Sequence, residues 1–250
     1  LMEDKKKIYY WAPFIDNVAT VKAVYNSANT LNKYSLGKYE GIILDAFGEW
    51  KNSKYFTLNK NIFYQLGLYP FLFKFSSLGF IRSRLKYVLI FILSYFPLKK
   101  FLFKEKPQFL IIHLISSLPL FINLLYKFDT KIILRISGKP KLNFFRYYFW
   151  KLSLSKIFKI TFPTIETLEY FKKLNIVKSD KLELLYDPIL KIKEINKLKK
   201  EDLDFSIKKN IFYLAIGRLS RQKNFIFLVN CFSEIIKNNK DTKLVIIGTG

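Results

Sequence analysis

The sequence predicts an α/β fold built on a doubly wound parallel sheet. Short apolar segments alternate along the chain with longer segments of helical period, and turn residues bound the apolar segments. This alternation is typical of a parallel sheet covered by helices on both faces. The 250 residues, 50% of them hydrophobic, supply material for one full domain and part of a second.

The predicted strands are short runs rich in isoleucine, leucine and aromatic residues. They are expected at 7–11, 41–44, 109–114, 131–136, 157–162, 182–185, 211–216 and 244–247. Helices are expected between them, at 18–31, 84–95, 118–126, 143–153, 164–174 and 225–236. Apolar runs bounded by turn residues, such as 211–216, are typical of strands buried on both faces. Ligands of such sheets bind at the carboxyl ends of the strands.

Residues 109–126 contain no charged side chain and approach the length of a membrane span. Polar residues interrupt this segment, and serines precede Pro119. Both features are typical of a helix start. The segment therefore predicts a strand followed by a helix that begins near Pro119.

The charged segment 191–210 shows little apolar periodicity and is predicted to link two domains. We expect an N-terminal domain over 1–190 and the start of a second domain over 211–250. The chain opens with Leu1-Met2 and stops directly after a predicted strand, which would leave an apolar edge exposed. We therefore expect a fragment of a longer protein, inactive by itself.

The composition is strongly basic and poor in cysteine. Lys and Arg total 43 against 19 Asp and Glu, for a formal charge of +24. Such a charge favours anionic partners, although an AT-rich genome would also enrich lysine. Nucleic acid is disfavoured, because the aromatic residues follow core periods and no recognition motif is present. Cys231 excludes an internal disulfide, fits a reducing cytoplasm and is expected to be buried on an apolar helix face.

Three cations crowd the start of the predicted helix at 225–236. Arg218, Arg221 and Lys223 follow Gly217, which ends a strand. A helix N-terminus favours acids, and each base there costs about 0.3–1 kcal/mol. A bound phosphate would reverse this penalty, because N–H groups and cations would then converge on one anion. The alternative is a solvated basic helix start in a chain that is basic throughout.

Residues 217–224 (GRLSRQKN) and 243–250 (KLVIIGTG) together resemble the start of the nucleotide-sugar domain of family-four glycosyltransferases. These enzymes have the GT-B fold of two Rossmann-like domains. The resemblance implies transfer of a sugar from a nucleotide-diphosphate donor to a lipid-linked or polysaccharide acceptor, with retention and without a metal ion. It also implies that Arg218 and Lys223, beside Gly217, hold the donor diphosphate. The family's paired-glutamate motif would lie beyond residue 250.

The first half of the chain carries weaker features of the same family. Residues 11–22 occupy the place of a glycine-rich loop, with Ala19 where glycine is common and Thr20 beside it. Residues 107–113 resemble a Pro-Asp-x-x-x-x-His strand, with glutamine in place of the aspartate. The resemblance places His113 in the catalytic cleft. Taken alone, a single histidine on an apolar strand is more often a core residue.

Ser137 and Gly138 follow the predicted strand at 131–136, where they border the acceptor site or form a plain turn. Asp202 and Asp204 have the spacing of a GT-A metal motif, but they lie in the charged linker. Gly248-Thr-Gly250 is a weak match to a dinucleotide fingerprint. We expect no metal and no other cofactor.

Residues 71–106 mix aromatic and cationic side chains densely. One helical stripe is predicted to face the core, and it consists of Leu85, Val88, Leu89, Ile92 and Phe96. A second apolar stripe is predicted to be available to a surface, and it consists of Tyr87, Ile90, Phe91 and Tyr95. The apolar run at 87–98 is too short to span a bilayer. The segment therefore favours peripheral binding to the anionic inner membrane face.

Two further interpretations of this segment and of the chain stay open. The helix could instead be buried on both sides with a solvated basic end. The whole chain could be a non-catalytic basic module that binds membranes or other polyanions.

Overall fold

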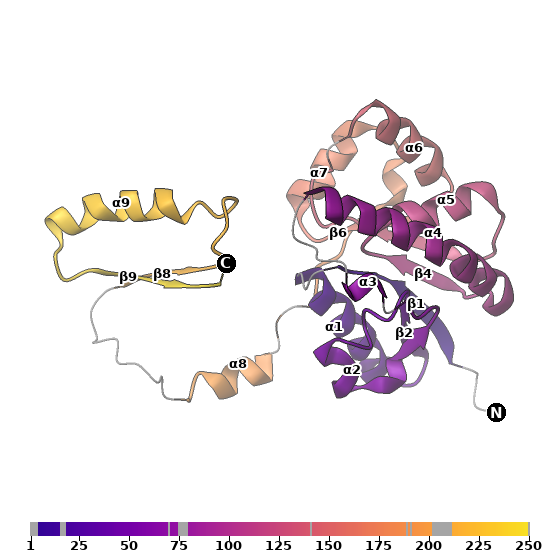
Figure 1. Ribbon diagram of the computed structural model, residues 1–250, viewed down its shortest axis with the longest axis horizontal. Helices are drawn as coiled ribbons and strands as arrows, with labels where there is room; N and C mark the ends of the chain where they lie inside the picture. Colours follow the sequence, from indigo (N-terminus) through magenta and orange to yellow (C-terminus); the bar gives the residue numbers. More distant parts are fainter. Residues whose placement is uncertain are drawn as a thin grey trace. The chain divides into compact units, whose positions relative to one another are not determined.

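A computed structural model of the chain describes residues 5–15, 19–69, 71–74, 80–140, 142–188, 190, 192–201 and 212–249. The chain divides into two compact units, residues 1–191 and 192–250. Figure 1 traces the chain through both units.

The first unit contains a sheet of seven parallel strands in the order β3-β2-β1-β4-β5-β6-β7. The strands are β1 (Lys6–Trp11), β2 (Tyr39–Asp45), β3 (Phe63–Gln65), β4 (Phe109–Ile112), β5 (Lys131–Arg135), β6 (Lys159–Phe162) and β7 (Leu182–Leu184). Strand order reverses between β1 and β4. In doubly wound sheets the crevice at such a reversal is where ligands bind.

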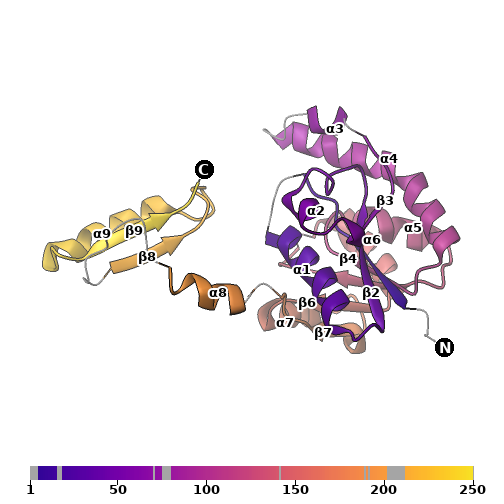
Figure 2. The same cartoon turned by 90° about the horizontal axis from the view of Figure 1, so that it is seen from below.

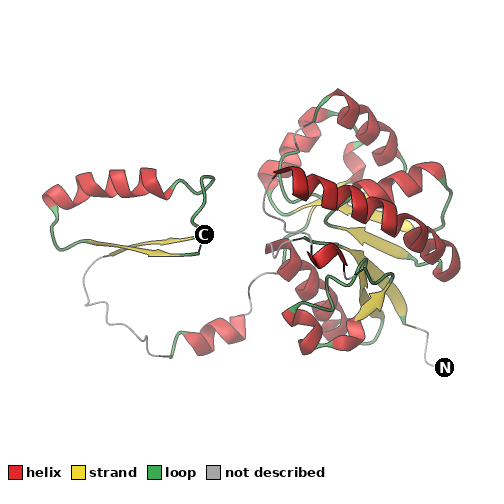
Figure 3. Cartoon of the chain, viewed as in Figure 1, coloured by secondary structure: helices red, strands yellow, loops and turns green. Residues whose placement is uncertain are grey.

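Helices cover both faces of this sheet (Figure 3). They are α1 (Ala19–Tyr34), α2 (Lys54–Leu58), α3 (Phe71–Lys74), α4 (Phe80–Glu105), α5 (Ser117–Leu125), α6 (Phe144–Ser155) and α7 (Ile165–Leu174). Side chains of β1 alternate between two cores, as a strand period of two requires. Tyr9 and Trp11 join the larger core with α4 to α7, whereas Tyr10, and Ala12 directly after the strand, join the smaller core with α1.

Helix α1 packs closely on β2 because Gly41 carries no side chain. A Cβ atom built on Gly41 would lie 2.8 Å from the Ala28 carbonyl oxygen. Asn32 fixes the same contact from α1: its Oδ1 accepts from the Gly41 N–H at 2.6 Å, and its Nδ2 donates to the Gly41 carbonyl at 3.0 Å. The glycine therefore sets the helix-to-sheet distance.

The predicted α/β fold with a parallel sheet is confirmed, and residues 109–126 divide into β4 and α5 as expected. The sequence interpretation missed β3, which is only three residues long. Residues 192–198 of the predicted linker form helix α8 (Ile192–Leu198), and Asp202 and Asp204 lie outside the described residues. The proposed domain limits at 190 and 211 stay a prediction.

The face of α4 that packs on the core is not the predicted one. Of the residues expected in the core, Leu85, Val88, Ile92 and Phe96 are 50% to 73% exposed, and only Leu89 packs against it. Ile90, Phe91 and Tyr95, which were expected at a surface, are buried in the core or pack against it. The buried side chains of this helix include Ile90, Ser94, Leu98, Phe101 and Leu102. Apolar residues occupy nearly every face of the helix, so its partners decide the buried side. Phe101, for example, lies edge-on against Tyr9 with ring centroids 4.9 Å apart.

The second unit also contains β8 (Phe212–Ile216), α9 (Phe225–Asn238) and β9 (Lys243–Ile247). The two strands are parallel, and α9 lies along one face of the pair (Figure 2). Phe232 of the helix contacts Tyr213 of β8, with ring centroids 6.0 Å apart. The expectation that β8 is buried on both faces is wrong, because α9 covers only one. Cys231 is exposed, contrary to the prediction, and no residue of α9 is buried.

Candidate functional site

In the first unit, hydrogen bonds pin the ends of β1 and β4 together where the strand order reverses. The His113 N–H donates to the Trp11 carbonyl at 2.9 Å, and the Trp11 indole Nε1 donates to the Ile115 carbonyl at 3.1 Å. Ile115 has φ of 47°, which is rare for a β-branched residue. Strain of this kind at a strand end is characteristic of functional sites.

His113 lies directly after β4 and is partly buried. Its ring stands 6.1 Å from the Tyr10 ring, and its Nδ1 is buried without a hydrogen-bond partner among the described residues. Burial first, and the positive charge of Arg135 second, lower the pKa of His113 to about 3. The imidazole is therefore neutral near pH 7, with one donor and one acceptor nitrogen. Its predicted catalytic role stays a prediction.

His113 lines a cavity of about 370 Å³, together with residues of α1, β1, β4, β5, β6 and β7 and of the segment after β7. Arg135 lines it, and its side chain is only 2% exposed. The guanidinium pairs with Asp187 at 2.5 Å and donates to the Leu185 carbonyl. Burial lowers the pKa of Arg135, and Asp187 partly offsets this. Sequence reasoning assigned no role to Arg135, although a cation at the end of an apolar strand is itself a signal.

The other predicted residues of the first unit lie near the carboxyl ends of strands. Ala19 begins α1 and is exposed, Thr20 is partly buried, and Ser137 and Gly138 are exposed after β5. A Cβ atom on Gly138 would meet nothing within 4 Å, so the space around it does not require glycine. None of the four lines the His113 cavity. Their roles stay predictions.

In the second unit, the ends of β8 and β9 meet at two glycines. A Cβ atom on Gly248 would lie 1.9 Å from the Gly217 carbonyl oxygen, so only glycine fits there. The Gly217 N–H donates to the Ile247 carbonyl at 3.0 Å, and the Leu219 N–H donates to the Thr249 carbonyl at 2.9 Å. This contact fixes the path of the loop that carries Arg218.

Lys223 turns back over this strand end. Its Cδ and Cε atoms lie 3.6 Å from the position of a Cβ on Gly217. Asn224, with φ of 48°, precedes α9, and its side chain does not cap the helix. The first turn of α9 contains no acid. Arg218 and Lys223 are exposed on the loop that precedes α9. An anion can therefore meet these two cations and the free N–H groups at the start of the helix.

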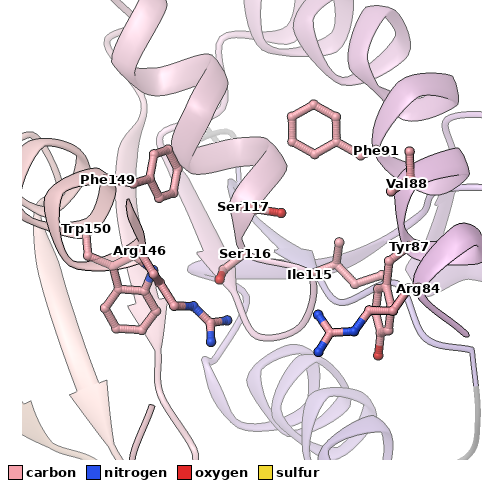
Figure 4. Close-up of a pocket in the computed structure, with 10 residues that line it drawn as sticks. All are labelled: Arg84, Tyr87, Val88, Phe91, Ile115, Ser116, Ser117, Arg146, Phe149 and Trp150. Atoms are coloured by element: carbon pink, nitrogen blue, oxygen red, sulfur yellow. The ribbon is translucent and has the colours of Figure 1, made fainter. Parts of the chain in front are cut away.

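A larger cavity of about 800 Å³ lies beside α4, α5 and α6, and sequence reasoning missed it. Its lining includes Arg84 from α4, Arg146 from α6, and Ser116 and Ser117 at the start of α5. The aromatic side chains that line it are Tyr87, Phe91, Phe149 and Trp150. Figure 4 shows the guanidinium groups of Arg84 and Arg146 pointing toward one another from opposite walls.

Within the described part of the chain, no group of three or more histidine, cysteine or acidic residues is placed to hold a metal ion. No helix among these residues has the length and hydropathy that a membrane span requires.

No protein-family model matches the chain, and no curated protein sequence matches it. The fold is similar to that of several solved structures. A glycosyltransferase from Rickettsia africae ESF-5 is 13% identical, with a TM-score of 0.54 over 99% of this chain and 69% of that one. UDP-GlcNAc 2-epimerase from Neisseria meningitidis bound to UDP-GlcNAc is 14% identical, with a TM-score of 0.57 over 98% of this chain and 66% of that one.

The glycosyltransferase of kitacinnamycin is 8% identical, with a TM-score of 0.58 over 98% of this chain and 66% of that one. The chain thus spans about two thirds of the length of these proteins. At such identities the likeness establishes the fold, and it does not single out family four. The chain has the Rossmann-like α/β fold of GT-B glycosyltransferases and UDP-GlcNAc 2-epimerases.

Proposed function

We propose that this chain is part of a glycosyltransferase that uses a nucleotide-diphosphate sugar, and that the donor diphosphate binds at the carboxyl end of β8. One observation carries the proposal: the contact between Gly217 and Gly248 shapes a loop from which Arg218 and Lys223 project beside an uncapped helix start. The fold likeness to a glycosyltransferase and to an epimerase bound to UDP-GlcNAc supports it.

The proposed chemistry follows from where charge develops. When the bond from sugar to diphosphate breaks, negative charge grows on the leaving diphosphate. Arg218 and Lys223 stabilise that charge as a metal ion does in other enzymes. We therefore propose a metal-independent reaction. The family-four resemblance adds retention at the anomeric carbon, which requires the acceptor hydroxyl to approach the face of the sugar that the diphosphate leaves.

His113 is proposed to hydrogen-bond a hydroxyl group of the donor sugar. Its neutral imidazole lines a cavity at the end of β4, beside the reversal of strand order. A neutral ring can donate and accept one hydrogen bond each. We propose that Ala19 and Thr20 of α1, and Ser137 and Gly138 after β5, border the donor and acceptor at the same strand ends.

The acceptor is proposed to be lipid-linked or a polysaccharide, used at the cytoplasmic face of the membrane. The exposed stripe of α4, which consists of Leu85, Val88, Ile92 and Phe96, supports peripheral binding. Each Lys or Arg near an anionic membrane surface adds about 1 kcal/mol to the free energy of membrane binding. The chain should therefore sediment with anionic vesicles at low salt and be released at high salt. Equal recovery with neutral vesicles would contradict membrane binding.

The binding of UDP and UDP-sugars to the whole chain, measured by titration calorimetry, tests the donor site. Arg218→Ala and Lys223→Ala should each weaken UDP binding about tenfold to a hundredfold, since a hydrogen bond to a charged group contributes about 1.5–3 kcal/mol. Lys240→Ala removes an equal charge at the far end of α9 and should change little. Chelating divalent ions should leave binding unchanged.

The same titration separates the alternatives. Unchanged UDP binding in both variants would refute the assigned roles of Arg218 and Lys223. Vesicle binding without any affinity for nucleotides would favour the non-catalytic membrane-binding module. The epimerase likeness supports a second candidate, epimerisation of a UDP-sugar. In a longer protein that turns over, conversion of the donor sugar to its epimer without an acceptor would favour that function over transfer.

A further inference from the structure

We propose that the cavity between α4 and α6 binds the phosphate group of an amphiphilic lipid, which would be the acceptor of the proposed sugar transfer. Only the identification of this lipid as the acceptor rests on the proposed function. The site itself is argued from the cavity, its two arginines and the apolar surfaces that continue from it.

The cationic part of the cavity comes from two helices that are distant in sequence. Arg84 of α4 and Arg146 of α6 line both the cavity of about 800 Å³ and an adjoining one of about 720 Å³. Their guanidinium groups point toward one another across the space in Figure 4. Two guanidinium groups on opposite walls can hold one phosphate from two sides, and arginine binds phosphate through paired N–H groups.

The floor of the cavity is suited to the same anion. Ser116 and Ser117 lie at the start of α5, and the Ser116 side chain makes no capping hydrogen bond to that helix. Hydroxyl groups and the first N–H groups of a helix donate to an anion in concert with nearby cations. The Trp11 indole holds the preceding turn at the Ile115 carbonyl, so this floor is fixed before any ligand binds.

The remaining walls are apolar, which a small hydrophilic phosphate would not need. The apolar lining includes Tyr87, Val88, Phe91 and Phe149. The centroid of the Trp150 ring lies 5.9 Å from the Arg146 guanidinium carbon. Val88 is also part of the exposed α4 stripe, together with Leu85, Ile92 and Phe96. An apolar path therefore leads directly from the cationic end of the cavity onto the surface of α4.

Helix α6 presents a second exposed apolar surface beside the same cavity. Its exposed members are Phe144, Phe145, Tyr148 and Leu152, with exposures from 49% to 82%. Phe145 lines the adjoining cavity next to Arg84 and Arg146. Exposed apolar surface on both flanks of a cationic cavity matches a molecule with a phosphate head and a hydrocarbon tail. We therefore commit to a phosphorylated lipid as the occupant, with its head between the arginines.

The test compares vesicles of phosphatidylcholine that contain either phosphatidic acid, a phosphomonoester, or phosphatidylglycerol, a phosphodiester, at matched negative charge. The whole chain should bind the phosphatidic acid vesicles at least about tenfold more tightly. Arg84→Gln/Arg146→Gln should abolish this preference, and Arg84→Lys/Arg146→Lys should retain part of it. Lys38→Gln/Lys127→Gln removes the same charge at the opposite ends of the strands and should retain all of it.

Three results would overturn the proposal. One is an equal affinity of the wild type for the two vesicle types. Another is an unchanged preference in Arg84→Gln/Arg146→Gln, provided that circular dichroism shows this variant to be folded. The third is full competition by glycerol phosphate at the lipid's own concentration, which would indicate a site for a free phosphate.

UDP binding measured on the same samples separates this inference from the proposed function. Retained UDP binding without a lipid preference would refute the lipid site alone. A retained lipid preference without UDP binding would refute the donor site alone.

Discussion

The buried ion pair of Arg135 and Asp187, beside His113, should contribute strongly to the stability of the first unit. Arg135 is 2% exposed and Asp187 is 18% exposed, and their charged atoms lie 2.5 Å apart. Asp187→Asn removes the negative charge and leaves the guanidinium buried, with its Nε lacking a hydrogen-bond partner among the described residues. Breaking a buried pair costs about 3–5 kcal/mol. Because Asp187 is partly exposed, we expect a loss at the lower end of this range, about 3 kcal/mol.

The chain contains a matched control. Lys139 and Glu166 also lie 2.5 Å apart, but their side chains are 50% and 78% exposed. Glu166→Gln should leave the unfolding midpoint essentially unchanged, because water screens an exposed pair. The double variant Arg135→Met/Asp187→Leu removes both buried charges. Its free energy of unfolding should lie within about 1 kcal/mol of the wild-type value.

Urea unfolding followed by tryptophan fluorescence is the assay. The three tryptophans are Trp11, Trp50 and Trp150, all in the first unit, so the signal reports on the unit that contains the ion pair. The unfolding midpoint of Asp187→Asn should fall by about 1 M or more, for a urea slope of about 2–3 kcal/mol/M. Equal midpoints for Asp187→Asn and Glu166→Gln would refute the reasoning that burial gives the first pair its larger effect.

Three further predictions use the same chain. Gly41→Ala should destabilise the first unit by about 1–3 kcal/mol in urea unfolding, because the new Cβ would press on the α1 backbone at Ala28. Gly138→Ala is the control, and it should change stability by less than about 0.5 kcal/mol. His113 stays neutral in the folded state down to about pH 3. In the unfolded state its imidazole takes up a proton as the pH falls below about 6.5, which favours unfolding. Stability should drop by about 2 kcal/mol from pH 7 to pH 5, measured by urea unfolding, and His113→Gln should lose this part of the drop. Gly248→Ala should abolish UDP binding, measured by calorimetry, without changing tryptophan-detected unfolding, because it separates β8 from β9 only in the second unit.

The sequence predicted most strands because each apolar run ends at a turn signal. It missed β3, a three-residue edge strand that ends on the polar Gln65. β7 is equally short, but its predicted run at 182–185 contains three leucines. The sequence interpretation placed the wrong face of α4 in the core, since apolar residues cover nearly all sides of that helix. Only the packing of Ile90 and Leu98 against α4's partners selects the buried side.

The candidate donor site was partly predictable because its residues are close in sequence. Gly217, Arg218 and Lys223 lie within one loop, although the contact of Gly217 with Gly248 appears only in the folded chain. The cavity between α4 and α6 could not be predicted, since Arg84 and Arg146 meet only through the packing of both helices on α5. The low pKa of His113 likewise depends on residues distant in sequence, first through burial and second through the charge of Arg135.

Lysine footprinting can show whether the loop after β8 holds the donor diphosphate. Acetylation of exposed lysines is measured by mass spectrometry with and without UDP. UDP should protect Lys223 strongly and leave Lys240, at the far end of α9, unprotected. Equal acetylation of Lys223 with and without saturating UDP would contradict the claim.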